Sequence, residues 1–232
     1  MTLLDRYLKG ETTEVYEELY SLGQDALSPD YFIQTDLLLK ETFRRVKLNL
    51  NIIYGELKKI NYHFVPDIKY DWQKPVLHPY PDTDQLLIEL RSKIKNSGYI
   101  PLSLEYFYRI VGSCNFCWDW ETKPEIPWEG ADPIDIPPIT TLITDILYDD
   151  YEEDNILLTG DYLQKDNISG SCYNIELTPS PSVDSLLIGW DVPFIEYLRQ
   201  TFNNCGFTMA DQCEYESLTL FCNSVRPHLL KI

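Results

Sequence analysis

The chain has 232 residues, a formal net charge of −18 and a sequence pI near 4.4. This length allows one large domain or two small ones, and it can bury a core without disulfides or metals. The charge excludes a typical nucleic-acid binder, which needs Lys and Arg for the phosphates, and it disfavours an anionic membrane surface. Basic proteins or cations are the partners that this charge attracts, although the same charge also keeps a protein soluble.

The negative charge is concentrated in the second part of the sequence. Residues 1–130 hold 20 acidic and 15 basic side chains, a net of −5, whereas residues 131–232 hold 17 and 4, a net of −13. The first 20 residues contain five acidic side chains and no apolar segment, so we expect no signal peptide. No apolar run approaches the roughly 20 residues of a membrane span. We therefore expect a cytoplasmic protein in which the six cysteines stay reduced.

Hydrophobic spacing predicts helices in the first half of the chain. The longest covers residues 35–62, with apolar side chains along one face and Gly55 as its only interruption. Shorter helices are predicted over residues 13–22 and 83–96. Residues 64–81 contain four prolines, which indicates an irregular connection.

A further helix is predicted after Pro101, whose missing N–H is not needed at a helix start. Ser103 is a candidate cap, and Gly112 is placed to end the helix. One face has the i, i+3, i+4, i+7 spacing and consists of Leu104, Phe107, Tyr108 and Val111. A short helix with one apolar face must pack on a larger unit, so we expect these four side chains to be buried between helices and sheet.

The second half has a β-like pattern with one clear helix, over residues 193–202. Prolines between residues 124 and 138 exclude a central strand there. Three segments suit strands: residues 115–120, 155–162 and 171–177. A hairpin turn at residues 165–170 joins the last two. Two apolar segments fit a helix and a strand equally well: residues 142–147 and 216–222.

These elements predict a single α+β domain. N-terminal helices over about residues 1–112 pack against a mainly antiparallel C-terminal β-sheet within about residues 113–232. The second part is expected to be mainly β with one helix. The oligomeric state is left open.

Motifs for catalysis or metal binding are sparse. Cys114 and Cys117 form a CxxC, but no second CxxC completes a zinc site, and a redox CxxC begins a helix rather than following one. The histidines are isolated: His63, His78 and His228. No nucleophile elbow, phosphate-binding loop or dinucleotide fingerprint is present. We therefore predict no catalytic residues, no metal and no cofactor; a hydrolase or transferase without a recognisable motif is the alternative.

An acidic run is the candidate partner-binding site. It places five carboxylates in six positions, and the tyrosines beside and within it add aromatic contact area. A solvated loop has the same composition, and the run lacks the residue spacing of a calcium loop. The predicted binding residues are Tyr148, Asp149, Asp150, Tyr151, Glu152, Glu153 and Asp154.

The predicted helix at residues 100–116 resembles the signature region of SUKH-superfamily domains. The similar residues are Ile100-Pro101-Leu102-Ser103, Phe107-Tyr108 and Val111-Gly112-Ser113-Cys114-Asn115-Phe116. Those domains carry two glycines after the helix, and this chain has Gly112-Ser113 there. Two further parts of the chain resemble a group of uncharacterised bacterial proteins associated with that superfamily: residues 41–49, and stretches between residues 162 and 207.

This resemblance implies an α+β fold with helices against one antiparallel sheet. It also implies relatives that often neutralise secreted bacterial toxins, including nucleases, without shared catalytic residues. We therefore expect a non-catalytic binding protein, an immunity-type inhibitor that holds a basic toxin or nuclease through an acidic surface. An intracellular peptide-binding scaffold and the enzyme named above are the alternatives.

Overall fold

The computed structural model describes residues 1–66, 71–148, 154–159 and 173–232. The helices in these residues are α1 (Leu3–Leu8), α2 (Thr12–Ser21), α3 (Phe32–Lys59), α4 (Thr83–Ile94), α5 (Leu102–Tyr106), α6 (Ile139–Tyr148), α7 (Phe194–Asn203) and α8 (Glu216–Val225). Short helical turns are η1 (Gly23–Leu27), η2 (Asp71–Gln73), η3 (Phe107–Val111), η4 (Ala210–Gln212) and η5 (Arg226–His228). The strands are β1 (Val76–Leu77), β2 (Ser113–Asn115), β3 (Asp135–Ile136), β4 (Asn155–Thr159), β5 (Tyr173–Glu176), β6 (Leu186–Ile188) and β7 (Val192–Pro193).

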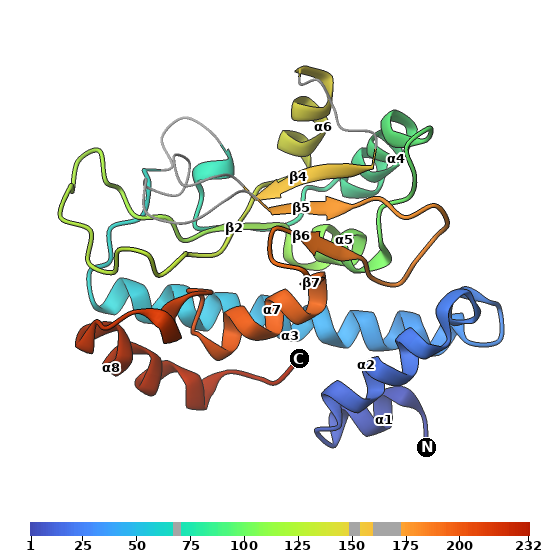
Figure 1. Ribbon diagram of the computed structural model, residues 1–232, viewed down its shortest axis with the longest axis horizontal. Helices are drawn as coiled ribbons and strands as arrows, with labels where there is room; N and C mark the ends of the chain where they lie inside the picture. Colours follow the sequence, from blue (N-terminus) through green and yellow to red (C-terminus); the bar gives the residue numbers. More distant parts are fainter. Residues whose placement is uncertain (67–70, 149–153, 160–172) are drawn as a thin grey trace.

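The strands form two antiparallel sheets. One has the order β1-β2-β3 and the other the order β4-β5-β6-β7, so the strands of each sheet pair in chain order. Figure 1 shows the second sheet. The edge position of β3 agrees with the prolines that precede and follow it. N-terminal helices together with a C-terminal antiparallel sheet confirm the predicted α+β class.

Helix α3 runs along the whole length of the molecule (Figure 1). It is continuous from Phe32 to Lys59, so Gly55 does not break it. Ile60, the last residue of the predicted apolar face, follows the helix and is 51% exposed, whereas the rest of the face is buried: Leu38, Leu39, Phe43, Val46, Leu50, Ile53 and Leu57. This face contacts α1, η1, β1, α5, η3 and α8. The periodicity of the sequence therefore identified the central element of the fold.

The segment after Pro101 differs from the predicted regular helix. Its one turn of α-helix, α5, continues as the π-helical turn η3, and the four expected side chains are buried, as predicted. The helix is not one-sided, because Glu105 and Tyr106 are buried as well. Ser103 is not a cap: Pro101 occupies the cap position, and the Ser103 hydroxyl donates instead to Asp184 at 2.7 Å.

Gly112 ends η3 with a positive φ of 104°, as its position predicts. A Cβ atom here would lie 2.1 Å from the carbonyl oxygen of Leu77. Only glycine therefore allows the chain to turn closely past β1 and enter β2.

The second half contains more helix than the sequence pattern indicated. Both segments left open between helix and strand are helical, in α6 and α8, and the predicted helix is α7. The described part of residues 113–232 therefore holds three helices where one was expected. β4 and β5 pair antiparallel as predicted, while the predicted turn at residues 165–170 lies outside the described residues.

One hydrophobic core connects all these elements and reaches from Leu3 to Ile232. In the part of the chain that the structure describes, every helix is too short or too polar to span a bilayer.

The Phe107→Ala substitution should lower the free energy of unfolding by about 3–5 kcal/mol. The Phe107 ring is fully buried and makes edge contacts with Phe43, Tyr108 and Phe194 at 5.7–6.4 Å between ring centres. Denaturant titration measures the change, with Ile33→Ala on the exposed side of α3 as the control. A loss below about 1 kcal/mol would place Phe107 outside the core.

Two glycine-to-alanine substitutions should act in opposite directions. Gly55 lies in the interior of α3 with open space around a Cβ position, so Gly55→Ala should stabilise the protein by about 0.5–1 kcal/mol. Gly112→Ala places a methyl group against the backbone of β1. This substitution should destabilise the protein by more than Gly55→Ala stabilises it. Thermal unfolding of both variants shows whether each substitution raises or lowers the melting temperature. Equal shifts would contradict the open space described at Gly55 and the close backbone contact described at Gly112.

Candidate functional site

The structure places only the two ends of the predicted acidic run. Tyr148 is the last residue of α6, and Asp154 is exposed immediately before β4. The Asp154 carbonyl oxygen accepts a hydrogen bond from the Leu177 N–H at 2.7 Å, which fixes this end of the run beside β5. The five predicted binding residues between them, at positions 149–153, lie outside the described residues.

A second group of carboxylates, here called the acidic face, lies on two segments that are distant in sequence. Its members are exposed and make no ion pair with any described residue: Glu121, Glu125, Glu129, Asp211, Glu214 and Glu216. Two contacts hold the segments together. The Trp128 indole donates to the Ser217 hydroxyl at 3.0 Å, and the Cys213 thiol lies 3.8 Å from the Glu129 carbonyl oxygen.

Two apolar side chains border the acidic face. Trp120 precedes Glu121 and is 41% exposed, and Leu220 lies one turn after Glu216 on α8 and is 62% exposed. The sequence does not reveal this surface, because Trp128 and Glu129 contact Ser217 and Cys213 only in the folded chain. The sequence signal was limited to an excess of acidic over basic residues in both segments, where Lys123 is the one basic residue.

A pocket of about 520 Å³ opens between α4, α5, the start of α3 and the loop before β6, and is called the α4–α5 pocket. Its wall is mainly apolar and includes Leu27, Phe32, Ile94, Tyr99, Ile100 and Leu102. Backbone hydrogen bonds shape it: Tyr99 pairs with Thr178, and the Leu102 N–H donates to the Ser182 carbonyl at 3.0 Å. No sequence motif indicated this pocket, since its residues come from positions 27 to 182.

Charged side chains form a chain of ion pairs along one side of this pocket. The buried Glu105 carboxylate accepts from the Arg91 Nε at 2.7 Å and from the Arg109 Nη1 at 3.0 Å. Arg109 also donates to Asp84 at 2.8 Å. Burial disfavours the charge on Arg109, but its hydrogen bonds to Asp84 and Glu105 outweigh burial and raise its pKa.

Asp184 joins three helices through four hydrogen bonds. Its carboxylate accepts from the hydroxyls of Tyr20 and Ser103 at 2.8 and 2.7 Å, and from the N–H groups of Ser185 and Ile195 at 3.1 Å. Burial raises the pKa of this carboxyl group, and the donated hydrogen bonds act in the opposite direction. All four donors bind the same Asp184 carboxylate, and no histidine is among them. The cluster therefore fixes the positions of the helices and does not pair a nucleophile with a base.

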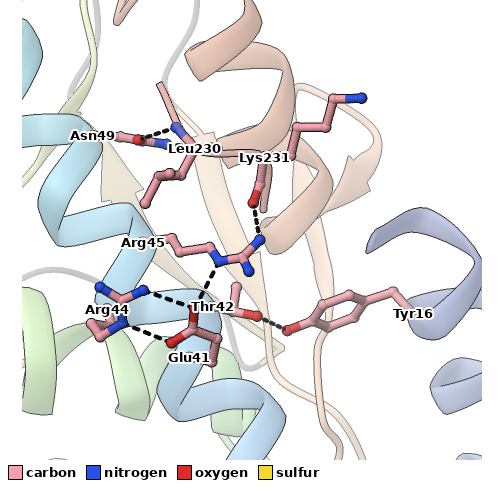
Figure 2. Close-up of polar contacts among 8 residues, drawn as sticks. All are labelled: Tyr16, Glu41, Thr42, Arg44, Arg45, Asn49, Leu230 and Lys231. Carbon is pink, nitrogen blue, oxygen red and sulfur yellow. Dashed lines mark hydrogen bonds and ion pairs between the residues drawn. The ribbon is translucent and has the colours of Figure 1, made fainter. Parts of the chain in front are cut away.

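A third polar cluster holds residues 229–232, here called the strap, against α3 (Figure 2). The Asn49 amide bonds both the N–H and the carbonyl of Leu230 at 2.8 Å. Arg45 donates to the Lys231 carbonyl at 2.7 Å and to Glu41 at 2.8 Å. Glu41 also binds Arg44, whose guanidinium lowers the pKa of the Glu41 carboxyl group. Arg199 on α7 also donates to the Ile232 carbonyl at 2.8 Å, so side chains of α3 and α7 together fix the strap.

The cysteines and histidines do not come together as a metal site. Cys114 lies in β2 and Cys117 just beyond it, both buried in the core. Among the residues that the structure describes, no three His, Cys, Asp or Glu side chains are grouped for metal binding. His63 is exposed and contacts the Trp118 ring at 5.3 Å between ring centres.

One thiol pair has no spacing motif in the sequence. Cys205 and Cys222 interact at the junction of α7 and α8, and this contact raises the pKa of Cys205 and lowers that of Cys222. Both carry free thiols and are buried. Their burial limits access to solvent.

The Glu41→Gln substitution should destabilise the protein at neutral pH by about 1–2 kcal/mol, because it leaves the largely buried Arg45 without its counter-ion. The pKa of Glu41 is lower in the folded chain than its ordinary value of 4.5, so its contribution is present above that pH and is lost as the pH falls. Denaturant titrations at several pH values should show the difference from wild type shrinking below pH 4.5. Glu17→Gln on the exposed side of α2 is the control, and an effect of Glu41→Gln that does not depend on pH would contradict the ion-pair role.

Comparison of the chain with protein-family models, with curated proteins and with solved structures gives no match. These comparisons therefore assign neither a family nor an activity. The resemblance of residues 100–116 to SUKH domains stays an expectation, and function has to be argued from the surfaces and the pocket described above.

Proposed function

We propose that this protein is a non-catalytic binding protein that holds a basic partner protein on its acidic surface. The observation that carries the proposal is the acidic face, six exposed carboxylates without ion-pair partners among the described residues. Carboxylates that served only to balance local charge would be paired with Lys or Arg. Elsewhere in the described residues basic side chains pair with other carboxylates, as Arg91 and Arg109 do with Glu105.

Electrostatics supports a role in association. Unpaired carboxylates on one face attract a basic partner over several ångströms and raise the rate of encounter, and salt weakens this effect. The neighbouring Trp120 and Leu220 side chains offer apolar area that a docked partner would bury. Charge would set the rate of association, and these side chains would add affinity.

The more specific form of the proposal is an immunity-type inhibitor of a basic bacterial toxin or nuclease. A nuclease presents a basic groove to its nucleic acid, so an acidic protein is complementary to it. The resemblance to SUKH domains implies the same role. Under this proposal the carboxylates between Asp149 and Asp154 also attract the basic partner.

The four-site variant Glu121→Gln, Glu125→Gln, Glu129→Gln and Glu214→Gln should slow association with the partner about tenfold or more at low salt. It should also flatten the dependence of the rate on salt. The partner is first captured from extracts of the source cells on the immobilised wild-type chain and identified, and association is then measured at low and high salt. The matched control also removes four carboxylates, with Glu14→Gln, Glu17→Gln, Asp25→Asn and Asp30→Asn.

The control should keep most of the wild-type rate, because its four positions lie on α2, η1 and the following turn. Equal slowing in both variants would mean that only net charge matters and that the acidic face is not the docking surface. A third variant neutralises the five carboxylates of the run at 149–154 and should slow association in the same way. If no basic protein is captured, the binding function itself is refuted.

A further inference from the structure

The α4–α5 pocket has the dimensions and lining of a small-molecule site. Its volume of about 520 Å³ lies within the range of roughly 300–1,000 Å³ that such sites occupy. Two large rings, Phe32 and Tyr99, line it and remain 40% and 51% exposed. Leaving aromatic surface in contact with water has a cost that an apolar ligand would remove.

The backbone holds the pocket open. Gly98, which follows α4, has a φ of 149° and approaches so closely that a Cβ atom would lie 2.8 Å from the Thr178 carbonyl oxygen. The N–H groups of Leu102 and Ser103 then donate to the carbonyls of Ser182 and Val183 at 3.0 and 2.9 Å. These contacts fix the wall opposite α4, so the cavity is built into the fold.

The charge of the pocket is opposite to that of the chain. Its charged lining residues are Arg91, Lys95 and Glu105, a net of +1 in a protein of net −18. Glu105 is fully engaged by Arg91 and Arg109. Lys95 is exposed and makes no ion pair within the described residues. An anionic group at the pocket mouth would therefore meet an uncompensated cation.

Arg91 and Lys95 are placed to act together on one anion. They lie four residues apart at the end of α4, so their side chains share a face of the helix. Arg91 donates to Glu105 through Nε and Nη2, and its Nη1 makes no hydrogen bond with the described residues. Both side chains therefore have N–H donors available for a carboxylate.

We propose that the α4–α5 pocket binds a small apolar carboxylic acid, with its hydrocarbon or aromatic body against Phe32, Tyr99 and Leu102 and its carboxylate at Lys95 and Arg91. The apolar wall selects against strongly polar metabolites, and the cationic mouth selects against neutral and cationic molecules. The residues of this pocket are not those of the acidic face. A result that contradicts one proposal therefore leaves the other unaffected.

The test uses two fluorescent probes of similar shape, anilinonaphthalene sulfonate, which is an anion, and N-phenylnaphthylamine, which is neutral. Titration of the full-length protein should show one sulfonate per chain, bound about tenfold more tightly than the neutral probe. Octanoate should displace the sulfonate, and octanol should do so much less well.

Variants separate the apolar wall from the cationic mouth. Lys95→Gln should weaken the binding of the sulfonate about tenfold and change the affinity for the neutral probe by no more than about twofold. Lys95→Glu should make the neutral probe bind more tightly than the sulfonate. Phe32→Ala should weaken both probes. The matched control is Lys93→Gln on the same helix, whose side chain pairs with Glu89 at 3.5 Å and does not line the pocket.

Thermal unfolding checks that each variant is folded; Lys95 is exposed at the end of α4, and the Lys93 side chain is 22% exposed. Equal affinity of the wild-type protein for the two probes would overturn the proposal. Sulfonate binding that is unchanged in both Lys95 variants would overturn it too, as would several probes per chain without saturation.

Discussion

Burial of α3 is the constraint on which the rest of the structure depends. A helix of 28 residues is about 42 Å long, and an apolar stripe of that length needs partners along all of it. Those partners come from the whole sequence: α1 and η1 precede it, β1, α5 and η3 follow, and α8 comes from the far end. Since no neighbouring segment is long enough to cover the stripe, α3 sets where the later helices and the sheets are placed.

The buried polar groups mainly secure this arrangement. Asp184 fixes α2, α5 and α7 relative to one another, Glu105 connects α5 to α4, and Asn49 holds the strap on α3. A buried carboxylate or amide costs free energy unless its bonds are made, so each cluster favours one relative position of its helices. The carboxylates of the acidic face and Lys95, on which the two proposals rest, lie instead at the surface and make no ion pair with the described residues.

The sequence predicted those elements that carry a long periodic signal. Helices α2, α3, α4 and α7 were found because their apolar residues repeat at helical spacing over ten or more positions. At α5 and η3 periodicity identified the helix and its buried face, but it indicated neither the π-helical turn nor the burial of Glu105 and Tyr106 beside that face. It also failed for β1 and β3, which are two residues long and too short to alternate. The acidic face and the α4–α5 pocket were beyond prediction, because each joins segments that are distant in sequence and become neighbours only in the folded chain.

The contacts made by α3 and the strap also determine how the chain can fold. Arg45 bonds a residue 186 positions away, Asn49 one 181 positions away, and Tyr20 one 164 positions away. An isolated helix forms within about a microsecond, but closing loops of this size is slow, since its entropic cost is incurred before any contact compensates it. We therefore expect the return of the distant segments to α3 to limit the rate of folding. Until they arrive, α3 exposes an apolar stripe, which makes this the stage at which the chain is most prone to associate with other molecules.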